Sequence, residues 1–175
     1  AQVALEKAIK LNPKDAQSHY QLGRLVSEEG KLGRAQSLLS NAISLDTRHG
    51  ASHYELGIVL LGREKVDSAS DEFQKALDLE PKNSDFIMGL VLALVEKKKL
   101  DKSLELLLPI TKIEKDNPKV FFAICNVYTK KGYFTVATEN CEKSLELDKS
   151  NFTTMNRLAW LYAKKRIKLK KAFEL

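Results

Sequence analysis

The sequence predicts an all-α solenoid of stacked helix pairs, because its residue types recur with a period of 34 residues. Residues 18–23 read SHYQLG, and residues 52–57, one period later, read SHYELG. A column of leucine-type residues follows the same step and contains Leu22, Leu56, Leu90, Ile124 and Leu158. A unit of this length cannot bury its apolar face alone, so we expect successive units to stack on one another.

Each repeat holds two stretches whose apolar residues are three or four positions apart, which is the spacing of one helix face. In the second repeat, Leu56 and Leu60 belong to the first stretch, and Phe73 and Leu79 belong to the second. Small residues also recur in columns, Gly57 among them, and small side chains let two crossing helices approach closely. We therefore predict two closely packed helices in each repeat, joined by a short turn.

The register of the columns sets the order of the elements. It divides the chain into the second helix of a partial repeat, four full repeats and a further partial repeat, at residues 1–15, 16–49, 50–83, 84–117, 118–151 and 152–175. Gly30 and Gly132 mark the turn between the two helices of a repeat, and Pro81 follows a second helix, where it removes no helical hydrogen bond. Because both ends are incomplete repeats without a polar cap, we expect a single array that is part of a longer one.

The third repeat departs from the columns. Val91, Ser103 and Ile110 occupy positions where the first two repeats carry Gly or Ala. Pro109 falls inside the predicted second helix, where a proline costs about 3 kcal/mol relative to alanine in an isolated helix. Larger side chains push crossing helices apart, so we predict a local change of curvature near residues 84–115.

In these columns the sequence resembles the tetratricopeptide repeat (TPR) family over essentially its whole length. The motif positions of the second repeat are His53, Leu56, Gly57, Leu60, Ala69, Phe73, Ala76 and Pro81. His19 and His53 stand where the family usually has tryptophan. The resemblance implies a right-handed superhelix of antiparallel helix–turn–helix units, in which the first helices line a concave groove that binds extended peptides or helices.

The groove positions implied by the resemblance lie on the first helix of each repeat. They are Tyr20, Arg24, Tyr54, Ile58, Met88, Leu92, Phe122, Asn126 and Trp160. The surface is apolar in the middle and polar at its ends, which favours an apolar peptide or an amphipathic helix of a partner protein. Ordinary packing between repeats is the alternative explanation for the same apolar residues. The function we expect is a protein–protein interaction scaffold, and the alternative is a homo-oligomeric scaffold that assembles through its ends or its convex face.

Chaperone-binding members of the family hold a C-terminal carboxylate with cationic and amide side chains. Here a carboxylate in the corresponding places would meet Glu55 and Asp85. Like charges repel, so we do not expect that specialisation.

The chain has a net charge of +6, much of it in residues 97–99 and 164–171. Such clusters are typical of contacts with acidic protein, nucleic acid or anionic membrane, and also of a solvated polar face. No aromatic residues interleave the C-terminal cluster, so a nucleic-acid partner is not expected. No apolar run is long enough to span a bilayer.

The sequence contains no catalytic or metal-binding constellation. His19 and His53 are one repeat apart, about 9 Å in packed helices, which is too far for one zinc ion. Cys125 and Cys141 fall in core columns of facing helices and are expected to be buried small apolar residues, although their positions permit a disulfide. We therefore expect no enzyme activity, no cofactor and no metal.

Overall fold

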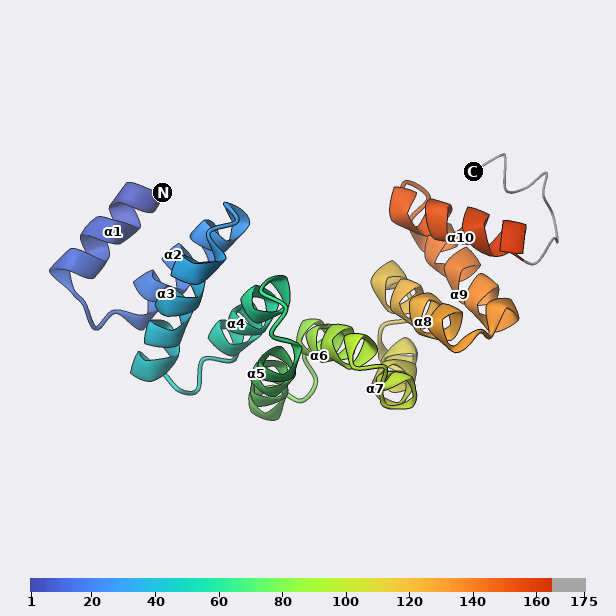
Figure 1. The fold of residues 1–175 in the computed structure, drawn as a ribbon, viewed down its shortest axis with the longest axis horizontal. Coiled ribbons are helices and arrows are strands. Elements are labelled where there is room, and N and C mark those ends of the chain that lie inside the picture. Colours follow the sequence, from blue (N-terminus) through green and yellow to red (C-terminus); the bar gives the residue numbers. More distant parts are fainter. Residues whose placement is uncertain (165–175) are drawn as a thin grey trace. The chain divides into compact units, whose positions relative to one another are not determined.

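The computed structural model describes residues 1–164, and over that part it contains ten α-helices and no strand (Figure 1). The helices are α1 (Gln2–Leu11), α2 (Ala16–Glu28), α3 (Leu32–Leu45), α4 (Gly50–Gly62), α5 (Val66–Leu79), α6 (Ser84–Glu96), α7 (Leu100–Ile113), α8 (Pro118–Lys131), α9 (Phe134–Leu147) and α10 (Phe152–Lys164). The all-α class predicted from the period is confirmed. Most of the C-terminal basic cluster and the end of the last partial repeat lie outside the described residues.

The helices keep the 34-residue register of the sequence. We call α2, α4, α6, α8 and α10 the first helices; they begin at Ala16, Gly50, Ser84, Pro118 and Phe152. Asparagine and aspartate side chains fix several of these starts. The Asp15 carboxylate accepts from the Ser18 backbone N–H at 3.3 Å, and the Asn117 side-chain oxygen accepts from the Lys119 N–H at 3.0 Å.

The turn between the two helices uses one left-handed residue at the same place in every full repeat. Gly30 and Gly132 have φ angles of 76° and 82°, as glycine readily does. The equivalent residues of the other two repeats are Glu64, with φ of 60°, and Lys98, with φ of 57°. All four full repeats therefore adopt the left-handed turn conformation, and only two of them have glycine at that position.

The described part of the chain folds as two compact units, which divide between Lys97 and Lys98. The first unit contains α1 to α6 and the second contains α7 to α10. The boundary falls in the turn of the third repeat, between Lys97 and Lys98, which is the repeat whose small-residue columns are broken. Helix α7 runs from Leu100 to Ile113 with Pro109 inside it.

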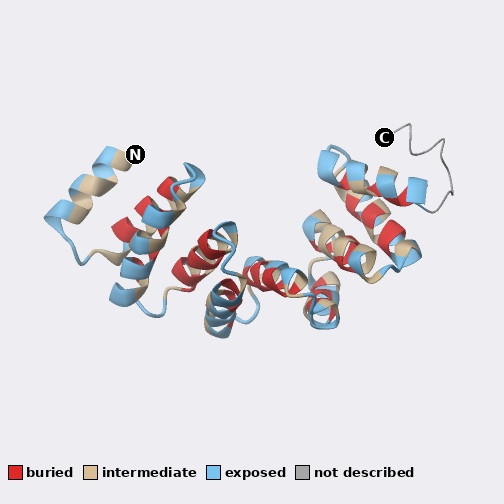
Figure 2. Cartoon of the chain, viewed as in Figure 1, coloured by how far each residue is buried: buried red, intermediate tan, exposed pale blue. Residues whose placement is uncertain are grey.

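The core of the first unit forms where a glycine of a first helix meets a large side chain of the next helix. A Cβ atom added to Gly23 would lie 2.8 Å from Leu39 Cγ, and one added to Gly57 would lie 2.6 Å from the Phe73 ring. Leu39 and Phe73 are both fully buried. The close approach predicted from the small-residue columns is confirmed for the first and second repeats. Figure 2 shows the buried residues as stripes along the packed helices.

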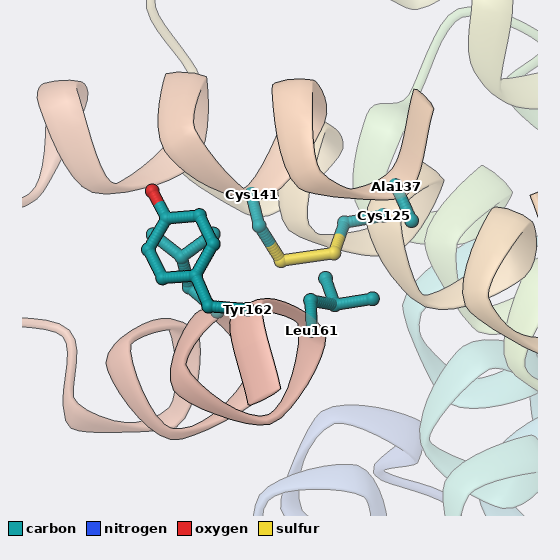
Figure 3. Close-up of a cluster of buried hydrophobic side chains, with 6 residues drawn as sticks. Cys125, Ala137, Cys141, Leu161 and Tyr162 are labelled. Atoms are coloured by element: carbon teal, nitrogen blue, oxygen red, sulfur yellow. A yellow bond between two sulfur atoms is a disulfide. The ribbon is translucent and has the colours of Figure 1, made fainter. Parts of the chain in front are cut away.

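In the second unit the equivalent crossing carries a disulfide between Cys125 of α8 and Cys141 of α9, with Cα atoms 5.4 Å apart. Both residues are fully buried, in a cluster with Ala137, Leu161 and Tyr162 (Figure 3). The prediction that the cysteines are buried is confirmed, and the disulfide that their positions permit is present. Their interpretation as two separate apolar side chains is wrong, because facing small residues at a close crossing bring the two sulfur atoms together.

Candidate protein-binding surface

The nine predicted groove residues all lie on first helices. In the first unit they are Tyr20 and Arg24 on α2, Tyr54 and Ile58 on α4, and Met88 and Leu92 on α6; in the second unit they are Phe122 and Asn126 on α8, and Trp160 on α10. Pairs on one helix are four residues apart, so they share a face. The surface is described below for each unit separately.

The N-terminal end of the first-unit surface is polar and internally paired. The Tyr20 ring contacts the His49 ring edge-on at 4.8 Å, and the Arg24 guanidinium lies 5.9 Å from the centre of the Tyr20 ring. Arg24 also contacts Glu55, with Nε 3.4 Å from Oε1, and Glu28, with Nη2 3.8 Å from Oε1. Burial raises the pKa of the Glu55 carboxyl above its ordinary value, and the nearby Arg24 opposes that rise.

Tyr54 is engaged in packing within the first unit. Its ring stacks on Phe86 at 5.4 Å and lies 5.7 Å from Phe73. A Cβ atom on Gly89 would come within 2.8 Å of Tyr54, so the glycine makes room for the ring. Desolvation by burial raises the pKa of the Tyr54 hydroxyl. Tyr54 therefore supports the surface through packing and is not one of its main contact residues.

Apolar side chains reach solvent farther along the same unit. Ile58 and Met88 are half-buried, and 51% of Leu92 is exposed. Leu92 is the most exposed of the large apolar residues on the first helices of this unit. It is one period after Ile58 and two after Arg24, so the column changes from charged to apolar along the chain.

In the second unit, Phe122 is half-buried against the core cluster that contains the disulfide. Trp160 remains 45% exposed, with its ring edge-on to Phe134 at a centroid distance of 6.0 Å. The side-chain oxygen of Asn126 is buried and has no hydrogen-bond partner among the described residues. Thr153, Asn156, Arg157 and Trp160 line an open depression on α10.

The charges of the first helices are segregated by unit, which analysis of whole-chain charge missed. Helices α8 and α10 contain Lys119, Lys130, Lys131, Arg157 and Lys164 and no acidic residue. Helices α2, α4 and α6 contain Glu28, Glu55, Asp85 and Glu96 against the single basic residue Arg24. The signal is present in the sequence, but it emerges only when charges are counted on first helices alone.

The histidines have structural partners. His53 Nδ1 lies 2.6 Å from the Glu72 carboxylate and its Nε2 lies 3.3 Å from the Thr47 carbonyl oxygen. His19 Nε2 lies 3.0 Å from the carbonyl oxygen of Pro13. Within residues 1–164 no three His, Cys, Asp or Glu side chains are placed to hold a metal ion. In the same part of the chain, no helix combines the length and apolar character needed to cross a bilayer.

Models of the tetratricopeptide repeat match residues 4–37 and 60–121, together more than half of the chain. Among solved structures, YrrB, a TPR protein with an unusual peptide-binding site, shares 25% identity over 99% of this chain and 89% of its own, with a TM-score of 0.74. PilF of Pseudomonas aeruginosa shares 23% identity over 93% of this chain and 75% of its own, with a TM-score of 0.82.

MamA of Desulfovibrio magneticus RS-1 shares 18% identity over 91% of this chain and 89% of its own, with a TM-score of 0.76, which shows likeness of fold. No curated protein sequence matches the chain. The repeat motif, the paired helices, the family models and the likeness to YrrB agree. The chain belongs to the tetratricopeptide repeat family.

Proposed function

We propose that this chain is a non-catalytic scaffold that binds a peptide or an amphipathic segment of another protein on the faces of its first helices. A protein-interaction scaffold is the general role that the repeat family and the similar TPR structures support. The observation that carries the specific proposal is the exposure of Leu92 and Trp160 on first helices, one in each unit. Large apolar side chains held at such a surface are typical of binding sites.

The packing contacts within the chain indicate which residues of the surface are available to a partner. Tyr54 and Phe122 are held by packing, so they shape the surface, whereas Leu92 and Trp160 have free area to offer a partner. Fully burying a leucine side chain contributes about 1.5–3 kcal/mol, so covering the exposed half of Leu92 contributes about 1 kcal/mol to binding. The peptide-binding site named for YrrB adds support by analogy of fold.

A second candidate function, assembly with further copies of the chain, is favoured by the N-terminal helix. Leu5 of α1 is half-buried, whereas its equivalents Leu39 and Phe73 in complete repeats are fully buried. An apolar helix face that is only half-buried can be covered by another helix. Light-scattering mass measured over a range of concentrations distinguishes the two candidates, because assembly predicts a mass above that of one chain.

A capture experiment with a matched control tests the main proposal. We compare the full chain, a Leu92→Glu/Trp160→Glu variant, and a Leu108→Glu/Val136→Glu control that changes exposed apolar residues of second helices. Circular dichroism first establishes that all three are folded. The proposal expects partner proteins to be captured by the full chain and the control and lost by the first variant. Equal capture by all three contradicts it.

A further inference from the structure

We propose that the second unit binds an acidic protein segment that also carries an apolar side chain, on a surface formed by α8 and α10. This inference rests on the proposed function and adds the chemistry of the partner. The surface, which we call the basic face, comprises Lys119, Phe122, Asn126, Arg157, Trp160 and Lys164.

Each helix carries its residues of the basic face on one side. On α8, Lys119, Phe122 and Asn126 are spaced by three and four residues, which places them on one side of the helix. On α10, Arg157, Trp160 and Lys164 have the same spacing. Trp160 is one 34-residue period after Asn126, whereas Lys119 and Phe122 correspond to Thr153 and Asn156, so the two sets share one repeat position.

The described residues do not neutralise the cations of the basic face. Within residues 1–164, Lys119, Arg157 and Lys164 form no ion pair. Other lysines of the same unit are paired: Lys131 with Asp101, and Lys143 with Glu146. Since α8 and α10 carry no Asp or Glu, a bound carboxylate would meet no like charge from these helices.

Arg157 and Trp160 define what the ligand must contain. Side chains three residues apart on a helix lie about 5–6 Å from each other at Cβ. A partner that offers a carboxylate to Arg157 and an apolar side chain to Trp160 therefore needs the two groups at a similar separation. Alternate residues of an extended strand provide this, because each residue advances about 3.3 Å.

Asn126 adds a polar group suited to a peptide backbone. Its side-chain oxygen accepts no hydrogen bond from the described residues, so a small movement of the side chain would let a partner N–H donate to it. A nucleic acid would also bring negative charge, but base stacking needs open aromatic faces. The edge-on contact of Trp160 with Phe134 and the half-burial of Phe122 offer few such faces.

The first unit provides an internal comparison. Its first helices carry Glu55, Asp85 and Glu96, and their one cation, Arg24, is already paired with Glu55 and Glu28. An acidic segment is repelled there, so the inference predicts binding that depends on the second unit alone.

Fluorescence anisotropy with defined probes tests the inference on the full chain. The probe is a labelled nine-residue peptide in which glutamate alternates with leucine or phenylalanine. Matched probes replace glutamate with lysine, or the apolar residues with serine, and an oligothymidylate of equal charge represents nucleic acid. The inference expects the acidic–apolar peptide to bind at least about tenfold more tightly than each matched probe.

Charge-reversal variants locate the site. Arg157→Glu should weaken binding of the acidic–apolar peptide by about tenfold or more, because it removes one charge-assisted contact and adds repulsion. Lys112→Glu makes the same change of charge at an exposed position of α7 and should alter affinity less than about twofold. Glu55→Lys in the first unit should likewise have little effect.

Three results would overturn the inference: equal binding of the lysine probe, an Arg157→Glu variant that binds as well as the original, or tight Arg157-dependent binding of the oligothymidylate alone. In each case the proposed function still stands if the Leu92→Glu/Trp160→Glu variant loses captured proteins. If that variant retains every captured protein, the proposed function fails whatever the peptide result.

Discussion

Cys125 and Cys141 are linked by a disulfide at the helix crossing that Gly57 and Phe73 occupy two repeats earlier. In the second repeat a large ring fills the space left by a glycine. In the fourth repeat two small side chains meet, and a covalent bond takes the place of that packing. The same architectural position is therefore held by shape in one unit and by a bond in the other.

Reducing the disulfide should destabilise the second unit. The bond closes a loop across 16 residues, and cross-linking a loop of about that length stabilises a fold by about 3 kcal/mol in the chain-entropy model. Trp160 is the only tryptophan of the chain, so its fluorescence reports unfolding of the second unit. We expect the urea midpoint followed by this signal to fall when a reductant is added.

The Cys125→Ser/Cys141→Ser variant is the control for that measurement. It should unfold at a lower urea concentration than the oxidised chain and should not respond to reductant. A midpoint of the unmodified chain that is the same with and without reductant would show that the bond contributes nothing to stability.

Gly57→Ala should destabilise the first unit by about 1–3 kcal/mol, the usual cost of overpacking a core. The added Cβ would lie 2.6 Å from the Phe73 ring, and that ring is already fully buried. Gly33→Ala is the matched change at a helix position with no atom within 4 Å, and it should be neutral or stabilise by up to about 1 kcal/mol. Chemical unfolding of both variants checks the prediction, which fails if the two shift in the same direction by the same amount.

Glu64→Gly should stabilise the first unit. Glu64 has a φ of 60°, and the left-handed conformation costs a residue with a Cβ about 1–2 kcal/mol, whereas glycine adopts it freely. The greater freedom of glycine in the unfolded chain offsets about 0.5–1 kcal/mol of that gain, so the expected net change is a rise of about 1 kcal/mol. Glu64→Ala keeps a Cβ at the same left-handed φ and should therefore not give this gain. A thermal midpoint that falls in Glu64→Gly would contradict the prediction.

Glu55→Gln should stabilise the chain at neutral pH and lose that advantage in acid. Burial raises the pKa of Glu55 above 4.5, which means that the folded state disfavours its charge relative to the unfolded state. The contribution of a carboxyl with a raised pKa is greatest when it is protonated, and it is lost as pH rises through the folded pKa. The variant is neutral at every pH, so the difference in unfolding free energy should shrink between about pH 7 and about pH 4. A difference that grows on acidification would mean that the Arg24 contact outweighs burial.

The sequence predicted the helices, and their packing in the first and second repeats, because the same physical requirement recurs in both. Leu39 and Phe73 each fill the space beside a glycine one repeat apart, and a pattern that recurs can be recognised without coordinates. The left-handed turn residue could be predicted in only two of the four full repeats. Glycine indicates the left-handed conformation at Gly30 and Gly132, whereas Glu64 and Lys98 adopt that conformation because the surrounding repeat imposes it.

The candidate surface was less accessible to sequence analysis, because exposure depends on neighbours from other helices. Tyr54 and Leu92 occupy groove positions that look alike in the pattern, yet Tyr54 stacks on Phe86 and Leu92 remains half exposed. Cys125 and Cys141 could be placed side by side from their columns, but the pattern does not distinguish a bond from a contact. Arg157 was not among the predicted groove residues, because it lies one position after the column that contains Tyr20, Tyr54, Met88 and Phe122.

Site-specific photocrosslinking tests the central claim, that a protein segment lies on the first helices, most directly. A photoreactive phenylalanine analogue replaces Leu92 or Trp160, and in a control it replaces Leu108, a second-helix residue of similar exposure, at 45% against 51% for Leu92. The proposal predicts that the first two positions crosslink to defined segments of a partner protein and that Leu108 does not. Crosslinks that form equally from all three positions, or from Leu108 alone, would contradict it.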